Sequence, residues 1–336
     1  MLALLTRPLG RIVAAAGLAV VIGLGWFVLQ AEPIFSSSSR VVLVAVHSGD
    51  SIATIAARMH HEGVIASPLA FRLDALIFGT PLVRPGMYEI AQGSSFSHVR
   101  AIFGAPPNVP EVDVVPGLTL HEVALALERV VGPRFANTFA ADANATSTPT
   151  PFAPSGSLEG LIGPGQYIIT PATTPSQLLT RMVEAFSREA AAVGLSATTT
   201  RDGLNSYQLI TGASIVEKEG YYAKNMPKVA RVIYNRLASA RPLQMDSTVL
   251  YYFNQDGGTV TPAMLRTVTP YNTYLNAGLT PTPICSVSSN AMRAMLNAPP
   301  GTWRYFVLVN KNGDMAFSTT FAEQLANERL AASRGL

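Results

Sequence analysis

The sequence ASIVEKEG, residues 213–220, places two carboxylates, Glu217 and Glu219, near the end of a segment that otherwise has the pattern of an apolar helix. Apolar residues recur there at helical spacing and share one face: Leu209, Ile210, Ala213 and Val216. Residues two apart on a helix point about 200° apart, so both acids cannot face one cleft. We therefore expect one site residue and one solvent-facing or salt-bridged charge. Helical periodicity does not say which is which, and two ordinary surface charges remain the alternative.

Composition limits the classes of function. The chain has 336 residues, enough for two or three domains, with 48% hydrophobic and 13% charged residues. The net charge of +3 is small and the basic residues are scattered along the chain, so no nucleic-acid partner is expected. Cys285 is the only cysteine and the five histidines all lie between His47 and His121, far from the two acids in sequence, so neither a cysteine-rich metal site nor a local histidine triad is expected. No metal and no cofactor are predicted.

The N-terminus carries a candidate membrane span. Residues 12–29 are uncharged and, at about 1.5 Å per residue, are just long enough to cross a hydrocarbon core. Arg7 and Arg11 precede this run, which predicts that residues 1–11 are a cytoplasmic tail. A cleaved signal peptide is the alternative, although Leu29-Gln30-Ala31 matches a cleavage site poorly. In either case residues 30–39 serve as a spacer and the rest of the chain is exported.

A small α+β module is predicted over residues 40–105. A strand at 41–46 is followed by a helix from Ile52 whose N-terminus small polar residues can cap. A second helix is expected over 68–78, and a turn leads into a strand near 85–90.

A larger domain is predicted over residues 110–335. Its first helix ends near Val131, and residues 142–157 have the composition of a flexible loop rich in Pro, Ser and Thr. Glu159 then lies in a glycine-rich loop before a strand at 167–170 and a helix from about Pro175 to Val193. Its carboxylate could line a cleft, or it could simply be a solvated or capping glutamate.

Polar amides, hydroxyls and tyrosines are concentrated downstream of the central helix in segments bounded by prolines. Such side chains suit a sugar-binding groove, because amides and carboxylates bond hydroxyls and tyrosine rings pack on sugar faces. Ordinary loop chemistry would also produce them. The residues in question lie in segments 243–251 and 269–274.

Two parts of the sequence resemble known protein families. Gly49-Asp50-Ser51-Ile52 and the residues after it resemble the LysM glycan-binding module over about fifteen residues. Five successive motifs resemble those of the YceG-like (MltG) endolytic murein transglycosylases, in the same order and at similar spacing: 213–219, 235–237, 243–249, 270–274 and 278–284. This resemblance covers nearly the whole exported chain. It implies a fold of class α+β, with one transmembrane helix, a LysM-like module and a mixed α/β catalytic domain that carries its glutamate on a helix.

The resemblance also implies a reaction and a set of site residues. The family's catalytic glutamate corresponds to Glu219, and Glu217 becomes its supporting neighbour. Glu219 would cleave the β-1,4 bond between N-acetylmuramic acid and N-acetylglucosamine and leave a 1,6-anhydro end, with a pKa raised by burial. The remaining residues expected to contact substrate are Asn235, Gln244, Asp246, Tyr271, Asn272, Thr273, Tyr274 and Glu159. The implied partners are peptidoglycan glycan strands, the bacterial inner membrane and cell-wall synthases, with the catalytic part in the periplasm.

The sequence departs from the family pattern at several positions. Gly220 replaces the usual Thr, Ala or Ser and should weaken the helix unless the glycan must approach the backbone there. Gly163, Gly165 and Gln166 replace an aromatic residue, Asp and Thr, and Met315 replaces a common histidine. A catalytically weak, peptidoglycan-binding scaffold and a hydrolytic muramidase therefore remain as alternatives.

Overall fold

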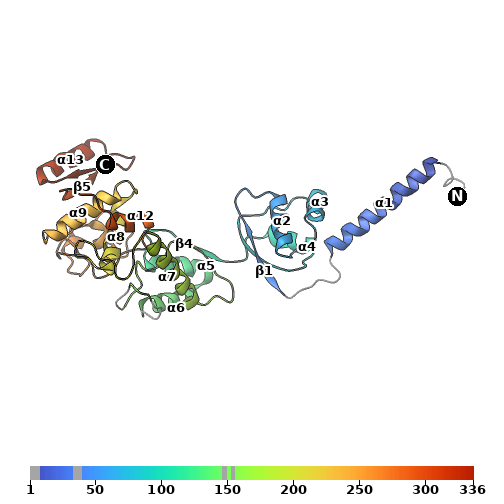
Figure 1. Cartoon of the computed structure of the whole chain (residues 1–336), viewed down its shortest axis with the longest axis horizontal. Coiled ribbons are helices and arrows are strands. Elements are labelled where there is room, and N and C mark those ends of the chain that lie inside the picture. Colours follow the sequence, from blue (N-terminus) through green and yellow to red (C-terminus); the bar gives the residue numbers. More distant parts are fainter. Residues whose placement is uncertain (1–7, 33–39, 146–149, 153–155) are drawn as a thin grey trace. The chain divides into compact units, whose positions relative to one another are not determined.

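The computed structural model describes residues 8–32, 40–145, 150–152 and 156–336 (Figure 1). The first seven residues of the predicted tail, residues 33–39 of the predicted spacer, and residues 146–149 and 153–155 of the predicted loop lie outside the described residues. The chain forms two compact units, the first ending at Glu111 and the second beginning at Val112. Helices and short strands occur in both units, so the predicted α+β class is confirmed.

The N-terminal helix α1 runs from Pro8 to Ala31, longer than the predicted span at both ends. Its stretch Ile12–Ala31 has a mean hydropathy of 2.5 and is not buried against the rest of the protein. By length and composition this helix is able to cross a membrane. Near its end Phe27 packs edge-on against Phe96, with ring centroids 6.5 Å apart.

The first unit is built on one antiparallel strand pair. Strand β1 (Val41–Val46) pairs with β2 (Gly86–Ala91), so that Val41 lies opposite Ala91. Helices α2 (Ile52–His61) and α3 (Pro68–Phe78) connect the two strands, and α4 (Phe96–Gly104) follows β2. The predicted cap is confirmed, because the Ser51 side chain accepts a hydrogen bond from the Thr54 amide. Aromatic side chains fill the core: Phe71, Tyr88, Phe96 and Phe103.

The second unit begins with a helical layer. Strand β3 (Glu111–Val114) pairs with β4 (Gly165–Ile168), and between them lie α5 (Leu120–Val131) and α6 (Pro133–Asn144). Helix α7 (Pro175–Ala192) packs against α6. The sequence did not reveal α6, and the predicted loop at 142–157 began too early, because 142–144 complete that helix.

Helix α8 (Ser206–Gly220) is the centre of the second unit (Figure 1). It packs against α9 (Met226–Ala238), α10 (Asp246–Tyr252) and α12 (Ser289–Leu296). The prediction of a single buried face is wrong, since every residue from Leu209 to Val216 is buried. The remaining elements are α11 (Pro262–Arg266), the hairpin of β5 (Tyr305–Leu308) and β6 (Met315–Ser318), and α13 (Phe321–Ser333).

A buried ion pair ties α3 to α4 in the first unit and generates a stability prediction. The side chain of Asp74 is only 3% exposed and pairs with Arg100, which is 26% exposed. Replacing Arg100→Leu leaves a buried carboxylate without its partner, which costs roughly 3 kcal/mol. Native-state hydrogen exchange of the β1 and β2 amides should then accelerate about a hundredfold.

The matched control is the exposed pair between Arg188 and Glu184, whose side chains are 71% and 62% exposed. Arg188→Leu should change stability by less than about 1 kcal/mol, read from the exchange of the α7 amides that surround this pair, because water already solvates both charges. Equal effects of the two substitutions would contradict the assignment of Asp74 as a buried charge.

Candidate functional site

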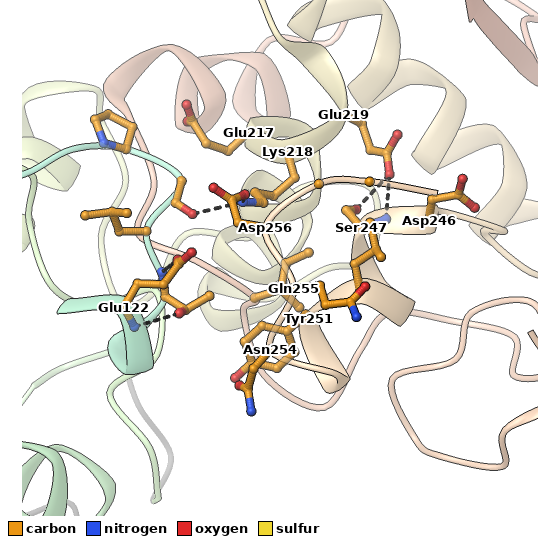
Figure 2. Close-up of a pocket in the computed structure, with 18 of the residues that line it drawn as sticks. Glu122, Glu217, Lys218, Glu219, Asp246, Ser247, Tyr251, Asn254, Gln255 and Asp256 are labelled. Carbon is orange, nitrogen blue, oxygen red and sulfur yellow. Dashed lines mark hydrogen bonds and ion pairs between the residues drawn. The ribbon is translucent and has the colours of Figure 1, made fainter. Parts of the chain in front are cut away.

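A cavity of about 590 Å³ lies at the C-terminal end of α8 (Figure 2). Its walls come from five parts of the second unit: the turn before α5 with the first turn of that helix, the end of α8, helix α10, the loop that follows α10, and Ile284 in the loop before α12. Residues from these walls include Gly117, His121, Glu122, Glu217, Lys218, Glu219, Tyr221, Asp246, Ser247, Tyr251, Asn254, Gln255 and Asp256.

Glu219 is held by the start of α10. Its Oε1 accepts two hydrogen bonds from Ser247, one from the hydroxyl at 2.7 Å and one from the backbone amide at 3.2 Å. Oε2 has no hydrogen-bond partner among the described residues. Burial raises the pKa of Glu219, the Ser247 bonds oppose that rise, and the charge of Asp246 adds to it. The direction agrees with the predicted shift.

Glu217 is held in the same way by a different helix. Its Oε2 accepts hydrogen bonds from the Ser288 hydroxyl at 2.6 Å and the Ser288 amide at 2.9 Å, at the N-cap of α12. The two carboxylates point apart, as helical geometry predicts (Figure 2). Both residues nevertheless border the cavity, so a position beside it does not by itself distinguish the two acids.

Lys218, between the two acids, reaches across the cavity. Its ammonium group donates a hydrogen bond to the Gly117 carbonyl at 3.2 Å and forms an ion pair with Asp256 (Figure 2). Asp256 belongs to the loop after α10, which also lines the cavity. The ion pair therefore joins α8 to this loop.

Asp246 is the third predicted site residue at the cavity. It is exposed at the first position of α10 and accepts a 2.6 Å hydrogen bond from the Tyr274 hydroxyl. Burial raises the pKa of Tyr274, and the bond to Asp246 raises it further, so this phenol keeps its proton. Tyr274 thus contributes to the site through Asp246.

Glu159 lies behind the cavity wall and is fully buried. Its carboxylate accepts a bond from the Leu120 amide at the start of α5 and another from the Tyr251 hydroxyl at 3.2 Å. Burial raises the pKa of Glu159 to about 7 despite these bonds. Of the two alternatives for this residue, capping a helix is what the contacts show, and only Tyr251 connects it to the cavity.

The other predicted residues lie outside the cavity wall and bond within the protein. The Asn272 amide donates to the carbonyls of Leu265 and Thr267, both at 2.9 Å, and the Asn235 amide donates to Trp303 at 2.7 Å. Side-chain hydrogen bonds join Thr273 to Thr248 and Tyr271 to Thr282. Gln244 is exposed, and its backbone has a φ of +49°. The Asn235 bond joins α9 to the segment before β5, and the other bonds hold the loop that follows α11. Substrate binding by these residues stays a prediction.

Sequence reasoning missed several residues that line the cavity or hold its two acids. Ser247 and Ser288 were not singled out because nothing in a serine's local sequence reveals a carboxylate bonded from another helix. His121 also borders the cavity, although it lies far from Glu219 in the sequence. Among the residues that the structure describes, no group of three or more His, Cys, Asp and Glu side chains is placed to hold a metal ion.

Gly220 has a packing explanation. A Cβ atom at this position would lie 2.7 Å from Cγ and 3.4 Å from Cα of Met226, at the start of α9. Gly220 is buried, and its contact with Met226 accounts for the glycine without an approaching glycan. The missing side chain lets α9 begin close against the end of α8.

A sequence model of the YceG-like family matches residues 44–330, which is most of the chain. The chain belongs to the YceG-like family. This confirms the family predicted from the five motifs.

Named relatives of this YceG-like chain share about a quarter of its residues. An endolytic murein transglycosylase of Bacillus subtilis is 27% identical over 90% of this chain and 88% of its own length. One of Streptococcus pneumoniae is 26% identical over 82% of this chain, which spans 55% of that longer protein. A crystal structure of a yceG-like protein from Listeria monocytogenes aligns with 86% of this chain and 99% of its own, at 26% identity and a TM-score of 0.54. These names support the predicted lytic transglycosylase.

The contact at Gly220 yields a prediction for this YceG-like chain. Gly220→Ala should lower the free energy of unfolding by roughly 1–3 kcal/mol, because the added methyl overlaps Met226. Met226→Ala should itself cost about 2–5 kcal/mol through lost packing. The double variant should be less destabilised than the sum of the two, because the shortened side chain removes the overlap. Urea unfolding followed by circular dichroism measures all three, and strict additivity would contradict the packing explanation.

Proposed function

We propose that the chain is a membrane-anchored endolytic lytic transglycosylase that cleaves the bond between N-acetylmuramic acid and N-acetylglucosamine in peptidoglycan. The observation that carries the proposal is the Glu219 carboxyl, which borders a cavity at the end of a buried helix and whose pKa burial raises. The names of the relatives, endolytic murein transglycosylase, support the same substrate.

The reaction needs one carboxyl in two successive roles. Glu219 first gives its proton to the glycosidic oxygen as the bond to C1 of the muramic residue breaks. The carboxylate then removes the proton from the C6 hydroxyl of the same sugar as that oxygen bonds to C1. The products are a 1,6-anhydro end and a free hydroxyl on the leaving sugar, and Glu219 regains its proton.

Ser247 determines which oxygen of Glu219 acts. Oε1 already accepts two hydrogen bonds, and an oxygen so engaged is a poor place for a proton. Oε2 is left to carry the proton and to transfer it. The same serine holds the carboxyl in one orientation, which favours proton transfer to a bound glycan.

The arrangement of the other acids favours this route over hydrolysis. A glycosidase that uses water or a covalent intermediate needs a second carboxylate across the scissile bond. Glu217 is turned toward Ser288, and Asp246 is bonded to Tyr274. Asp246 still borders the cavity, so a muramidase is the alternative that product analysis must exclude.

The rest of the chain would bring this site to nascent glycan. We propose that α1 is a single-pass anchor in the bacterial inner membrane and that the two units lie in the periplasm. The first unit would bind glycan in the manner of a LysM module. Cell-wall synthases are the candidate protein partners, and cleavage would terminate glycan elongation.

The first test compares the two acids of α8 as isosteric amides. Glu219→Gln should lower the rate of release of 1,6-anhydro muropeptides from purified sacculi at least about a hundredfold, because an amide cannot donate the proton. Glu217→Gln should lower it by less than about tenfold, because the amide oxygen can still accept from Ser288. Chromatography with mass spectrometry measures the products.

Three outcomes would overturn parts of the proposal. An equal loss of activity in Glu219→Gln and Glu217→Gln would show that the two acids do not differ in role. Products with ordinary reducing ends would indicate a muramidase. Binding of sacculi without any cleavage by the wild type would indicate the scaffold.

A second test uses the pH dependence of kcat/KM. The acid form of Glu219 is the active one, so activity should fall as pH rises through its pKa. The Ser247 hydroxyl stabilises the carboxylate and lowers that pKa, so Ser247→Ala should move the alkaline limb to higher pH. Ser288→Ala removes the corresponding bond from Glu217 and should leave the limb in place. A shift of similar size in both variants would count against Glu219 as the acid.

A further inference from the structure

Helix α3 and the turn after it expose an unusual amount of apolar surface. We define the α3 patch as Leu69, Leu73, Leu76, Ile77, Phe78 and Leu82. Leu76 is 80% exposed and Leu82 is 81% exposed, and Ile77 and Phe78 are each 63% exposed. Scattered single apolar residues are normal on a protein surface, but a contiguous set of this size marks an interaction site.

The exposed patch does not result from poor packing of α3 against the first unit. The opposite face of α3 is already packed, since Ala70, Phe71 and Ala75 are buried in the first unit and Asp74 is paired with Arg100. Leu69, Leu73 and Leu76 recur at helical spacing on the outer face. Helix α3 is therefore apolar on both sides, and its outer side needs an apolar environment of its own.

The contact between α3 and the candidate membrane anchor indicates what that environment is. Helix α1 contacts α3 directly, and the side chains that α1 packs against this unit, Phe27 and Ala31, come from its last turns. Those turns are where the hydrophobic span ends and the polar boundary of the bilayer begins. The helix that carries the α3 patch thus contacts the one described helix that is suited to cross a membrane.

The charged residues around the patch are those that a membrane surface would attract. From Pro68 to Arg84, all of which the structure describes, the exposed charged residues are Arg72 and Arg84, both basic. The single acid, Asp74, is buried and neutralised by Arg100, whose guanidinium also lies 4.9 Å from the centre of the Phe78 ring. Basic residues beside an apolar helix face suit anionic lipid headgroups.

We propose that the α3 patch docks into the boundary between headgroups and acyl chains of the membrane that α1 crosses. The proposal rests on α1 as an anchor, but not on the chemistry at Glu219. It gives the first unit two points of attachment, one spanning the bilayer and one lying in its surface. The first unit is then held at the membrane surface and cannot rotate freely about the end of α1.

The experiment reconstitutes the full chain into vesicles of phosphatidylethanolamine and phosphatidylglycerol. Single cysteines replace Leu76, Leu82, Ala53 or Val20 and carry an environment-sensitive fluorophore. Ala53 is an exposed residue of α2 outside the patch, and Val20 lies within the span of α1. Cys285 is fully buried, so the wild type serves as the labelling blank. Lipids with a spin label high on the acyl chain quench any probe in the boundary region, and lipids with the label near the chain end quench the probe at Val20 if α1 crosses the bilayer.

The expected result is blue-shifted emission and quenching by lipid at Leu76 and Leu82, and water-like, unquenched emission at Ala53. Emission at Leu76 that is as water-like as at Ala53 would overturn the docking. Blue-shifted emission without lipid quenching would also overturn it, by showing that protein covers the patch. Absence of quenching at Val20 would refute the anchor and the docking together, whatever the enzyme activity.

A variant tests whether the apolar side chains drive the contact. With the probe at Leu82, the double substitution Leu73→Asn and Leu76→Asn should reduce lipid quenching to the level seen at Ala53. Leu125→Asn, which removes an exposed leucine on α5 of the second unit, should leave it unchanged. Unchanged quenching in the double variant would contradict docking through this helix face.

Discussion

The burial of α8 on every side from Leu209 to Val216 is the constraint on which the site depends. A helix without a solvent face must satisfy its own polar side chains internally, and it does so, since Thr211 donates to Tyr207 and Ser214 donates to Thr211. The Ser214 hydroxyl also accepts the Ile284 amide, which ties a distant loop to the helix. Only the last turn reaches the cavity. The carboxylates are therefore presented from a rigid element, which is what proton transfer at a fixed distance requires.

The two acids of that last turn show how chemical environment separates similar residues. Each accepts a hydroxyl and an amide from one serine, Glu217 from Ser288 and Glu219 from Ser247. Burial raises the pKa of Glu219, and Asp246 beside it raises the pKa further. The serine that lowers this pKa also fixes the orientation of the carboxyl. The site thus combines a carboxyl whose pKa burial raises with an orientation set by one hydrogen-bonding residue.

Local sequence patterns predicted much of the fold but not the contacts between elements. The strand at 41–46 and the helix at 68–78 were predicted with their observed limits, because alternation, helical spacing and small polar caps are encoded locally. Helix α6 was missed, and its last residues were assigned to a flexible loop, because that segment is rich in small residues without a strong apolar pattern. For the site, helical geometry predicted that the two acids diverge, and the family resemblance distinguished Glu219. The roles of Ser247, Lys218 and Glu159 come from contacts between segments far apart in sequence, which no local pattern records.

The source of the attacking oxygen is the most direct test of the whole account. If one carboxyl serves both steps, the C6 hydroxyl of the substrate closes on C1 and no water enters the product. Digestion of sacculi in water enriched in oxygen-18, followed by mass spectrometry of the new glycan ends, measures this. The account predicts anhydro ends without the heavy isotope. Incorporation of one heavy oxygen at each new end, formed at the rate of cleavage, would contradict it and show that water is the nucleophile.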